Sequence, residues 1–152
     1  MKDFVEIRII EAVRKMLSGR VNDVLREAQF EIPIIEFGDY EGGSVFVPEI
    51  ALTTCERTEK ERIVRLDAYS LTIAFNFPDK QESELYCYAY SAAVGKAVSD
   101  DPTLGGIADR AVIVSKKYTD FKESRGLVVT LRVTVETMNN EQGTMNNVKM
   151  GV

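Results

Sequence analysis

Residues 100–106 constrain the fold more than any other part of the chain, because they read Asp-Asp-Pro-Thr-Leu-Gly-Gly. Pro102 cannot continue a helix, and the paired glycines adopt positive φ at little steric cost. An Ala-rich stretch with helical spacing precedes this segment, and two stretches of alternating apolar residues follow it. The segment therefore predicts a sharp change from helix to strand. Its turn-forming residues are Asp100, Asp101, Pro102, Leu104, Gly105 and Gly106.

Two closing strands are expected after this turn. Residues 127–136 have an apolar residue at every second position from Leu127 to Val135, which is the period of a strand with one buried face. Residues 110–118 form the strand before it, and an eight-residue loop bordered by Lys116-Lys117 and Arg125 joins the two. The pattern therefore predicts a strand pair at the end of the domain.

A long β-hairpin is predicted over residues 49–77. Apolar and polar residues alternate from Tyr69 to Phe77, but Val64 and Leu66 carry the apolar phase on the opposite side. Such a switch indicates a bulge, or an arm that leaves the sheet and contacts another molecule. The charge-balanced tip is either simply solvated or an inter-subunit arm. Its charged residues are Glu56, Arg57, Glu59, Lys60, Glu61 and Arg62.

Two main helices complete the expected fold. Residues 3–17 have the apolar stripe of an amphipathic helix, and Ser18-Gly19 is the expected end. A second short helix fits within residues 20–31. The stretch from about 79 to 98 places small and aromatic residues on one side, which we expect to lie on the sheet, and leaves Tyr88 outside it. The sequence thus predicts an α+β fold: a mostly antiparallel β-sheet with two main helices packed on one face and a long β-hairpin arm.

Length and composition favour one domain. The 152 residues, 45% of them apolar, can bury a core without staples. We expect that domain over residues 1–137 and a flexible polar tail over 138–152, where the apolar period stops. No apolar run approaches the ~20 residues that span a bilayer. The acidic start of the chain also argues against a secretion signal.

The charge pattern restricts the class of partner. The net charge is −5, which argues against a free-standing nucleic-acid binder, because such proteins usually present a basic face. Residues 27–49 hold no Lys or Arg, so this segment alone carries six negative charges. Its acids are Glu27, Glu31, Glu36, Asp39, Glu41 and Glu49.

No residue set points to a reaction. There is no His, and Cys55 and Cys87 lie far apart on different expected elements, so neither a zinc site nor a disulfide is expected. Asp100 and Asp101 could ligate Mg²⁺ or Ca²⁺, but adjacent acids in a loop are more typical of turns and caps, and the alternating acids of a calcium loop are missing. Phosphate-binding glycine motifs and a GxSxG nucleophile motif are also missing. We expect no enzyme, no cofactor and no metal.

The order of elements resembles that of the tail terminator and tail completion proteins, a family of minor tail proteins of long-tailed bacteriophages. The resemblance is carried by the helix end at residues 94–98, the turn at 100–106 and the strand pair that follows. Together these cover roughly residues 79–136. Residues 1–78 match the family in pattern only, and the segment after 137 does not match it.

The resemblance implies a ring, commonly a hexamer, at the head-proximal end of the tail tube. Such a ring stops tube polymerisation and offers a surface to head-completion proteins. The implied partners are further copies of the chain, the tube protein and a head-completion protein, with no membrane. The implied location is the virion tail, and the bacterial host cytoplasm during assembly. DNA would pass through without specific binding. Some of the six acids of residues 27–49 would then line the bore and repel phosphate, or they form an ordinary acidic outer surface.

Two other interpretations remain open. The chain could be a neck or head–tail joining protein of a phage or prophage, which would copurify with heads rather than with tails. It could also be a small cytoplasmic ligand-binding or enzymatic α+β domain. A deep pocket with convergent carboxylates would favour the latter.

Overall fold

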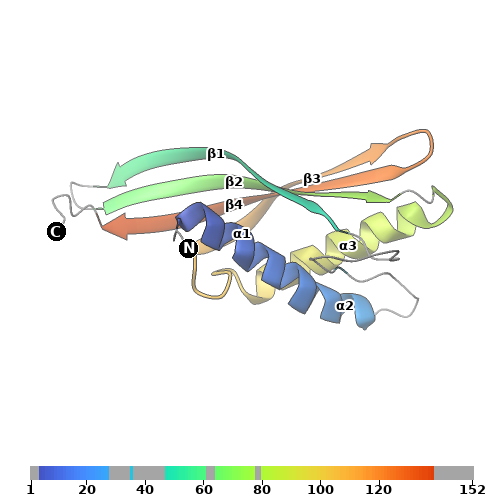
Figure 1. Ribbon diagram of the computed structural model, residues 1–152, viewed down its shortest axis with the longest axis horizontal. Helices are drawn as coiled ribbons and strands as arrows, with labels where there is room; N and C mark the ends of the chain where they lie inside the picture. The colour runs from blue at the N-terminus through green and yellow to red at the C-terminus, as the bar shows by residue number, and fades with distance from the viewer. Residues whose placement is uncertain (1–3, 28–34, 36–46, 61–63, 78–79, 139–152) are drawn as a thin grey trace.

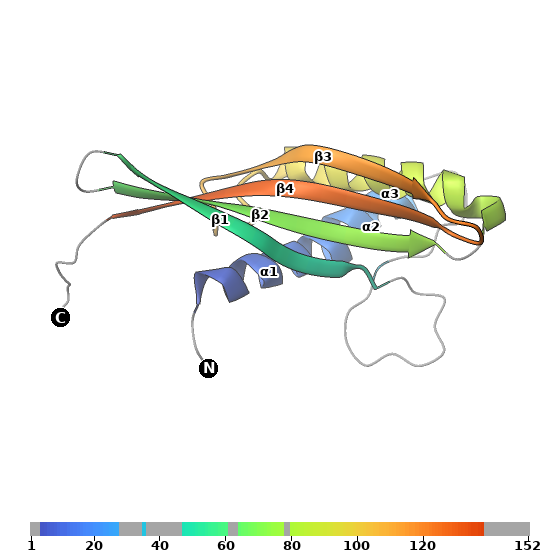
Figure 2. The same cartoon turned by 90° about the horizontal axis from the view of Figure 1, so that it is seen from above.

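The computed structural model describes residues 4–27, 35, 47–60, 64–77 and 80–138 of the chain. Four strands form one antiparallel sheet in the order β1-β2-β4-β3. The helices lie together on one face of this sheet, which confirms the predicted α+β fold (Figures 1 and 2). The elements are α1 (Val5–Met16), the π-helical turn η1 (Leu17–Val21), α2 (Asn22–Arg26), β1 (Glu49–Lys60), β2 (Val64–Phe77), α3 (Lys80–Asp100), β3 (Arg110–Asp120) and β4 (Arg125–Met138).

The expected helix end at Ser18 and Gly19 is wrong. The chain continues from α1 through η1 into α2, so that the short second helix is joined to the first without a break. Leu17 and Val21 are both fully buried, and a stop between them would remove Val21 from the core. The π-helical turn has i→i+5 hydrogen bonds, so it holds one more residue than an α-helical turn and shifts the side chains that follow it around the helix axis.

The core lies between this helical layer and the sheet. Where the helices cover the two central strands, every second residue points to them, and the side chains of Leu71, Ile73, Leu131 and Val133 have no exposed surface. Because the period of two places alternate side chains on one face, the sequence predicted these positions correctly. The helical layer contributes Ile9, Val13, Leu17, Val21, Tyr90, Ala93, Val94 and Ala97.

Helix α3 places the predicted side on the sheet. Tyr90 is fully buried, and its ring centroid lies 5.2 Å from the centroids of both Phe75 and Phe77. Burial raises the pKa of the Tyr90 phenol above its usual range. Ala93 is also fully buried, whereas Tyr88 is 56% exposed on another side of the helix, as expected.

The loop between the closing strands is shorter than predicted. β3 runs on to Asp120 and β4 begins at Arg125, so four residues connect them instead of eight. Phe121 donates a backbone hydrogen bond to Ser124 at 2.9 Å, which closes a tight turn. The additional pairs Thr119–Gly126 and Asp120–Arg125 extend the ladder through a segment that has no clear apolar alternation.

The hairpin arm is confirmed, and β4 adds a third strand to it. β2 pairs with β1 on one side and with β4 on the other as far as Val64, which lies opposite Met138. β2 therefore stays within the sheet along its whole length. The bulge that the phase switch indicated in β2 is therefore wrong, because β2 pairs with β4 without a shift from Val64 to Phe77. The irregularity in the pairing of β1 with β2 lies in β1, between Leu52 and Thr54. Figure 1 shows this end of the sheet extending past the helices.

Ala93 tests the close approach of α3 to the sheet. We expect Ala93→Leu to lower the free energy of unfolding by about 1–3 kcal/mol, because the additional Cγ, Cδ1 and Cδ2 atoms cannot fit into a packed core without strain. The neighbouring Ala92 is exposed. Ala92→Leu is therefore the matched control, with an expected change within about 0.5 kcal/mol. Urea unfolding of both variants measures the difference, and equal losses would contradict the packing described.

Candidate functional site

The predicted turn after α3 is organised by one carboxylate. Asp101 accepts a hydrogen bond from the backbone amide of Gly105 at 2.8 Å and another from the Thr103 hydroxyl at 3.1 Å. Both oxygens of this side chain are thus used to shape the turn. Among the residues that the structure describes, no group of three potential ligands could hold a metal ion. Asp101 therefore has the turn role that the sequence favoured.

Three consecutive residues of the turn have positive φ: Leu104 at 52°, Gly105 at 72° and Gly106 at 92°. The two glycines were predicted to do so, but the leucine was not. A left-handed conformation costs a residue with a Cβ about 1–2 kcal/mol. The Leu104 side chain is 4% exposed, and its burial contributes about 1.5–3 kcal/mol. Packing of this side chain therefore offsets the backbone strain.

Main-chain hydrogen bonds fasten the turn to the sheet. The amide of Ala111 donates to the carbonyl of Pro102 at 2.6 Å, and the amide of Asp109 donates to the carbonyl of Thr134 at 2.9 Å. The Asp109 carboxylate also accepts from the backbone amide of Glu136. The turn consequently holds the end of α3 against both β3 and β4.

Asp100 links the same region to η1. Arg20 Nε lies 3.0 Å from Asp100 Oδ2, and Lys96 Nζ lies 3.6 Å from the same oxygen. The hydrogen bond from Arg20, supported by the charge of Lys96, holds the pKa of the Asp100 carboxyl below its usual range. The carboxyl is more than one third exposed, so water screens these interactions.

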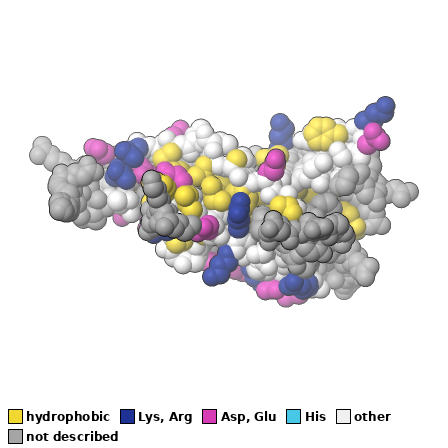
Figure 3. Space-filling view, viewed as in Figure 1, with side chains coloured by type: hydrophobic (Ala, Val, Ile, Leu, Met, Phe, Trp, Pro, Cys, Tyr) yellow, Lys and Arg dark blue, Asp and Glu magenta, His cyan; other side chains and the backbone are white. Residues whose placement is uncertain are grey.

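A groove of about 530 Å³ runs between α1–η1 and this turn. Its apolar lining consists of Ala12, Met16, Ala97, Leu104 and Ile107. Charged residues of both signs surround that lining, namely Arg8, Glu11, Lys15, Arg20 and Asp101. Figure 3 shows hydrophobic side chains gathered left of centre on one face of the molecule, with charged side chains around them. Such a groove can accept a small amphipathic molecule or a side chain of a partner.

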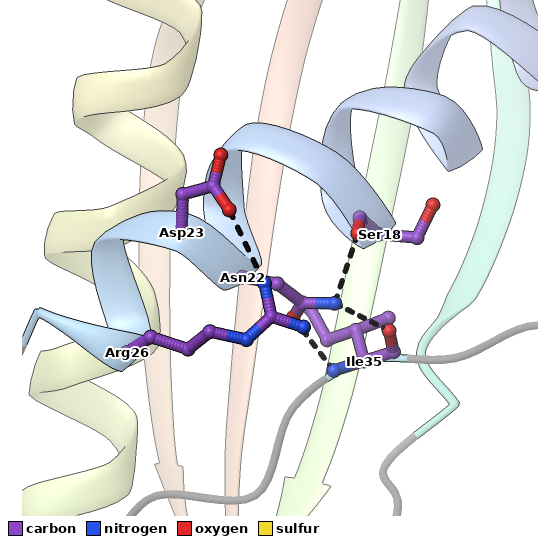
Figure 4. A network of polar contacts seen from close by, with 5 residues as sticks. All are labelled: Ser18, Asn22, Asp23, Arg26 and Ile35. Carbon is purple, nitrogen blue, oxygen red and sulfur yellow. Dashed lines mark hydrogen bonds and ion pairs between the residues drawn. The ribbon is translucent and has the colours of Figure 1, made fainter.

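A buried amide that the sequence did not reveal holds Ile35 against the helices (Figure 4). Asn22 is 2% exposed. Its Nδ2 donates to the Ile35 carbonyl at 2.6 Å and to the Ser18 carbonyl at 3.1 Å, and its Oδ1 accepts from the Ile35 amide at 2.7 Å. The available signal was an asparagine at helical spacing from Ser18 and Leu25. The two hydrogen bonds between Asn22 and Ile35 hold this residue of the acid-rich segment 27–49 against the helices.

Two of the six predicted lumen acids can be located. Glu27 is exposed at the end of α2, and Glu49 is exposed at the first position of β1, so they lie on different elements. The other four, Glu31, Glu36, Asp39 and Glu41, lie outside the described residues. Whether any of the six lines a bore stays a prediction.

Some of the predicted charges of the hairpin tip are paired within the protomer. Asp67 is 4% exposed, and its carboxylate oxygens lie 2.9 Å from Arg57 Nε and 3.4 Å from Arg65 Nε. The hydrogen bond to Asp67 raises the pKa of the Arg57 guanidinium further above its ordinary value. Glu56 and Glu59 are exposed on the same strand, whereas Glu61, Arg62 and the Lys60 side chain lie outside the description. The inter-subunit role of this arm stays a prediction.

A hydrogen bond between β2 and α1 holds the base of the arm. The Tyr69 hydroxyl donates to Glu6 of α1 at 3.2 Å, and burial together with nearby negative charge raises the pKa of that phenol. The first turn of α1 is thereby attached to β2 at the point where the sheet leaves the helical layer.

An aromatic cluster lies at the opposite end of the sheet. The rings of Tyr88 and Tyr118 meet edge to face at 5.7 Å, and the Tyr118 hydroxyl lies 2.9 Å from the Ser91 hydroxyl. Tyr88, Tyr118 and Phe121 are each about half exposed. The sequence suggested Tyr88 as a residue available to a partner, and the structure adds the two others.

Comparison with protein-family models gave no match, and comparison with curated proteins gave none either. No helix in the described part of the chain is long and apolar enough to cross a membrane. Both cysteines are free, with Cys55 exposed on β1 and Cys87 buried on α3.

Substitution of Gly106 by alanine tests the turn geometry, and the same substitution at the helical Gly19 should change the free energy of unfolding in the opposite direction. We expect Gly106→Ala to lower the free energy of unfolding by about 1 kcal/mol, because a Cβ disfavours the φ of 92° although nothing lies within 4 Å of it. A Cβ at Gly19 also meets open space, but Gly19 is helical. Gly19→Ala should therefore raise stability by about 0.5–1 kcal/mol. Thermal or urea unfolding checks both signs, and a stabilising Gly106→Ala would contradict the turn.

Asp100 gives a pH-dependent prediction. Its pKa is lower in the folded chain than the ordinary value of 3.8, so the Arg20 contact stabilises the fold above that pH. This stabilisation is lost as the pH falls through the folded pKa. Carboxyl carbon shifts in an NMR titration should show a midpoint below 3.8 that rises toward 3.8 in Arg20→Gln. Arg26→Gln is the control, because Arg26 pairs with Asp23, and it should leave the Asp100 midpoint unchanged.

Proposed function

We propose that this chain is a structural virion protein that caps the tail tube of a long-tailed phage as a ring. It ends tube polymerisation and provides the surface to which the head is joined. The partners in this proposal are further copies of the chain, the tube protein and a head-completion protein. The order of elements, with a helix, a long hairpin, a second helix and two closing strands, supports it by resemblance to the tail terminator family.

The open sheet is the observation that carries the proposal. Among the described residues, in the order β1-β2-β4-β3, each of the outer strands has a single strand neighbour, so this part of the protomer presents two different sheet edges. A contact between two different surfaces is heterologous, and repetition of a heterologous contact closes into a ring when the rotation allows it. Edge strands can supply such a contact through main-chain hydrogen bonds.

Tube growth in the presence of the protein tests this function. Purified protein is added to polymerising tail tube protein of the same phage, and tube lengths are measured by negative-stain imaging. The proposal expects shorter tubes with a ring of additional density at one end. Tubes of unchanged length with bare ends would refute it. Binding to isolated heads but not to tubes would support a joining protein instead.

The groove beside α1 favours one second candidate, a ligand-binding domain. Its apolar lining, within a rim that carries charges of both signs, would suit a small amphipathic molecule. A chain that remains monomeric, leaves tubes unchanged and shows shifted NMR signals of Met16 and Ile107 with a medium-chain carboxylate would support this candidate. Unchanged signals would reject it.

A further inference from the structure

We propose that edge strand β1 of one copy pairs with edge strand β3 of the next copy, with residues 49–54 beside residues 112–117. The two strands would run antiparallel and make one continuous sheet across the boundary between copies. This inference rests on the proposed function, because it names the interface that would build the ring.

Strand direction permits this pairing. All neighbours in the sheet are antiparallel, and the sheet has four strands, so β1 and β3 run in opposite directions. When an identical copy is placed beside the first with its strands aligned, its β1 lies antiparallel to the β3 of the first. Every pair of neighbouring strands is then antiparallel, both within each copy and across the boundary between copies.

The register follows from rows of paired residues across one protomer. Glu49 pairs with Ala74, Ala74 with Val128, and Val128 with Lys117, so Glu49 and Lys117 end the same row at opposite edges. They also point to the same face of the sheet, the one without helices. Two copies placed level with each other therefore bring Lys117 of one beside Glu49 of the next.

Two bulges match each other in this register. β1 has one additional residue between Leu52 and Thr54, and β3 has one between Ile113 and Ser115. These irregularities lie next to each other, because Leu52 and Ile113 end the same row through Leu71 and Leu131. A bulge normally disrupts pairing with a regular strand. Here each additional residue has a counterpart, so residues 49–54 face residues 117–112 one for one.

The side chains along the two edges are complementary. Glu49 would face Lys117, and Leu52 would face Val114, whose side chain is exposed in the single protomer. Three rows beyond Leu52, Glu56 and Arg110 end the row through Ala68 and Thr134 on the helix-free face. Opposite charges across strands are favourable and like charges are not, so Lys117 and Arg110 would disfavour pairing of β3 with another β3.

Two features beside β3 affect its proposed pairing with β1 of the next copy. The Ala111 amide is already bonded to Pro102, so pairing of main chains would begin at Val112. An open groove of about 340 Å³ lies along this edge between α3 and β3, and its lining includes Gly95, Val98, Val112 and Ile113. The neighbouring β1 would cover this groove from the side.

A pair of introduced thiols tests the register. Ala51 and Ser115 are exposed and would face each other across the boundary. Within one protomer they stand on opposite edges, three strand spacings or roughly 14 Å apart, beyond the reach of a disulfide. In a Cys55→Ser background, Ala51→Cys with Ser115→Cys should give a ladder of covalent multimers under mild oxidation. Ala51→Cys with Thr119→Cys, four residues along the same strand, is the control and should cross-link at least tenfold more slowly.

A charge exchange gives an independent measurement. Glu49→Lys alone and Lys117→Glu alone should each weaken self-association roughly two- to fivefold by light scattering, in line with one cross-strand charge pair. The double variant Glu49→Lys with Lys117→Glu should recover it. Additive losses in the double variant would overturn the pairing, as would equal cross-linking of the two thiol pairs or a monomer in every assay.

Failure of this interface and failure of the proposed function are distinguishable. A chain that stops tube growth but gives no cross-link between positions 51 and 115 refutes the pairing and leaves the function standing. A chain that cross-links specifically but does not affect tubes supports the pairing and refutes the function.

Discussion

The covering of one sheet face by two helical segments is the constraint on which the rest of the structure depends. Leu71 and Leu131, on the central strands, have no exposed surface, and Tyr90 of α3 packs against both Phe75 and Phe77. This packing requires α1 to continue through η1, because Val21 belongs to the same buried layer. Since one helical layer covers one face, the two edges of the sheet and its other face remain at the surface, where contacts between copies can form.

The turn after α3 connects this packing to the candidate contact surfaces. Asp101 shapes it, Leu104 anchors it in the core, and its hydrogen bond from Ala111 sets where the open edge of β3 begins. The same segment forms one wall of the groove beside α1. Residues 100–106 therefore form part of the groove and also limit the free edge of β3.

Several elements could be predicted because their signal is local. Alternation identified the buried positions of β2 and β4, and helical spacing placed Tyr90 and Ala93 on the sheet and Tyr88 outside it. The prediction failed where tertiary packing overrode local preference. Ser18 and Gly19 have the composition of a helix end, yet burial of Val21 keeps the helix going. The turn of four residues between β3 and β4 was hidden because residues 119–120 and 125–126 show no apolar alternation, although ladder pairing continues through them.

For the candidate contact surfaces too, some features follow from the sequence and others only from the tertiary structure. The sequence by itself determined the α+β class, the strands with one buried face and the position of the turn, because side-chain periodicity and backbone preferences act over a few residues. Only the tertiary structure decided that β1 and β3 become the edges, that their bulges lie in adjacent rows and that Asn22 holds Ile35. Strand order and register depend on contacts between residues far apart in the chain, and no local pattern contains that information.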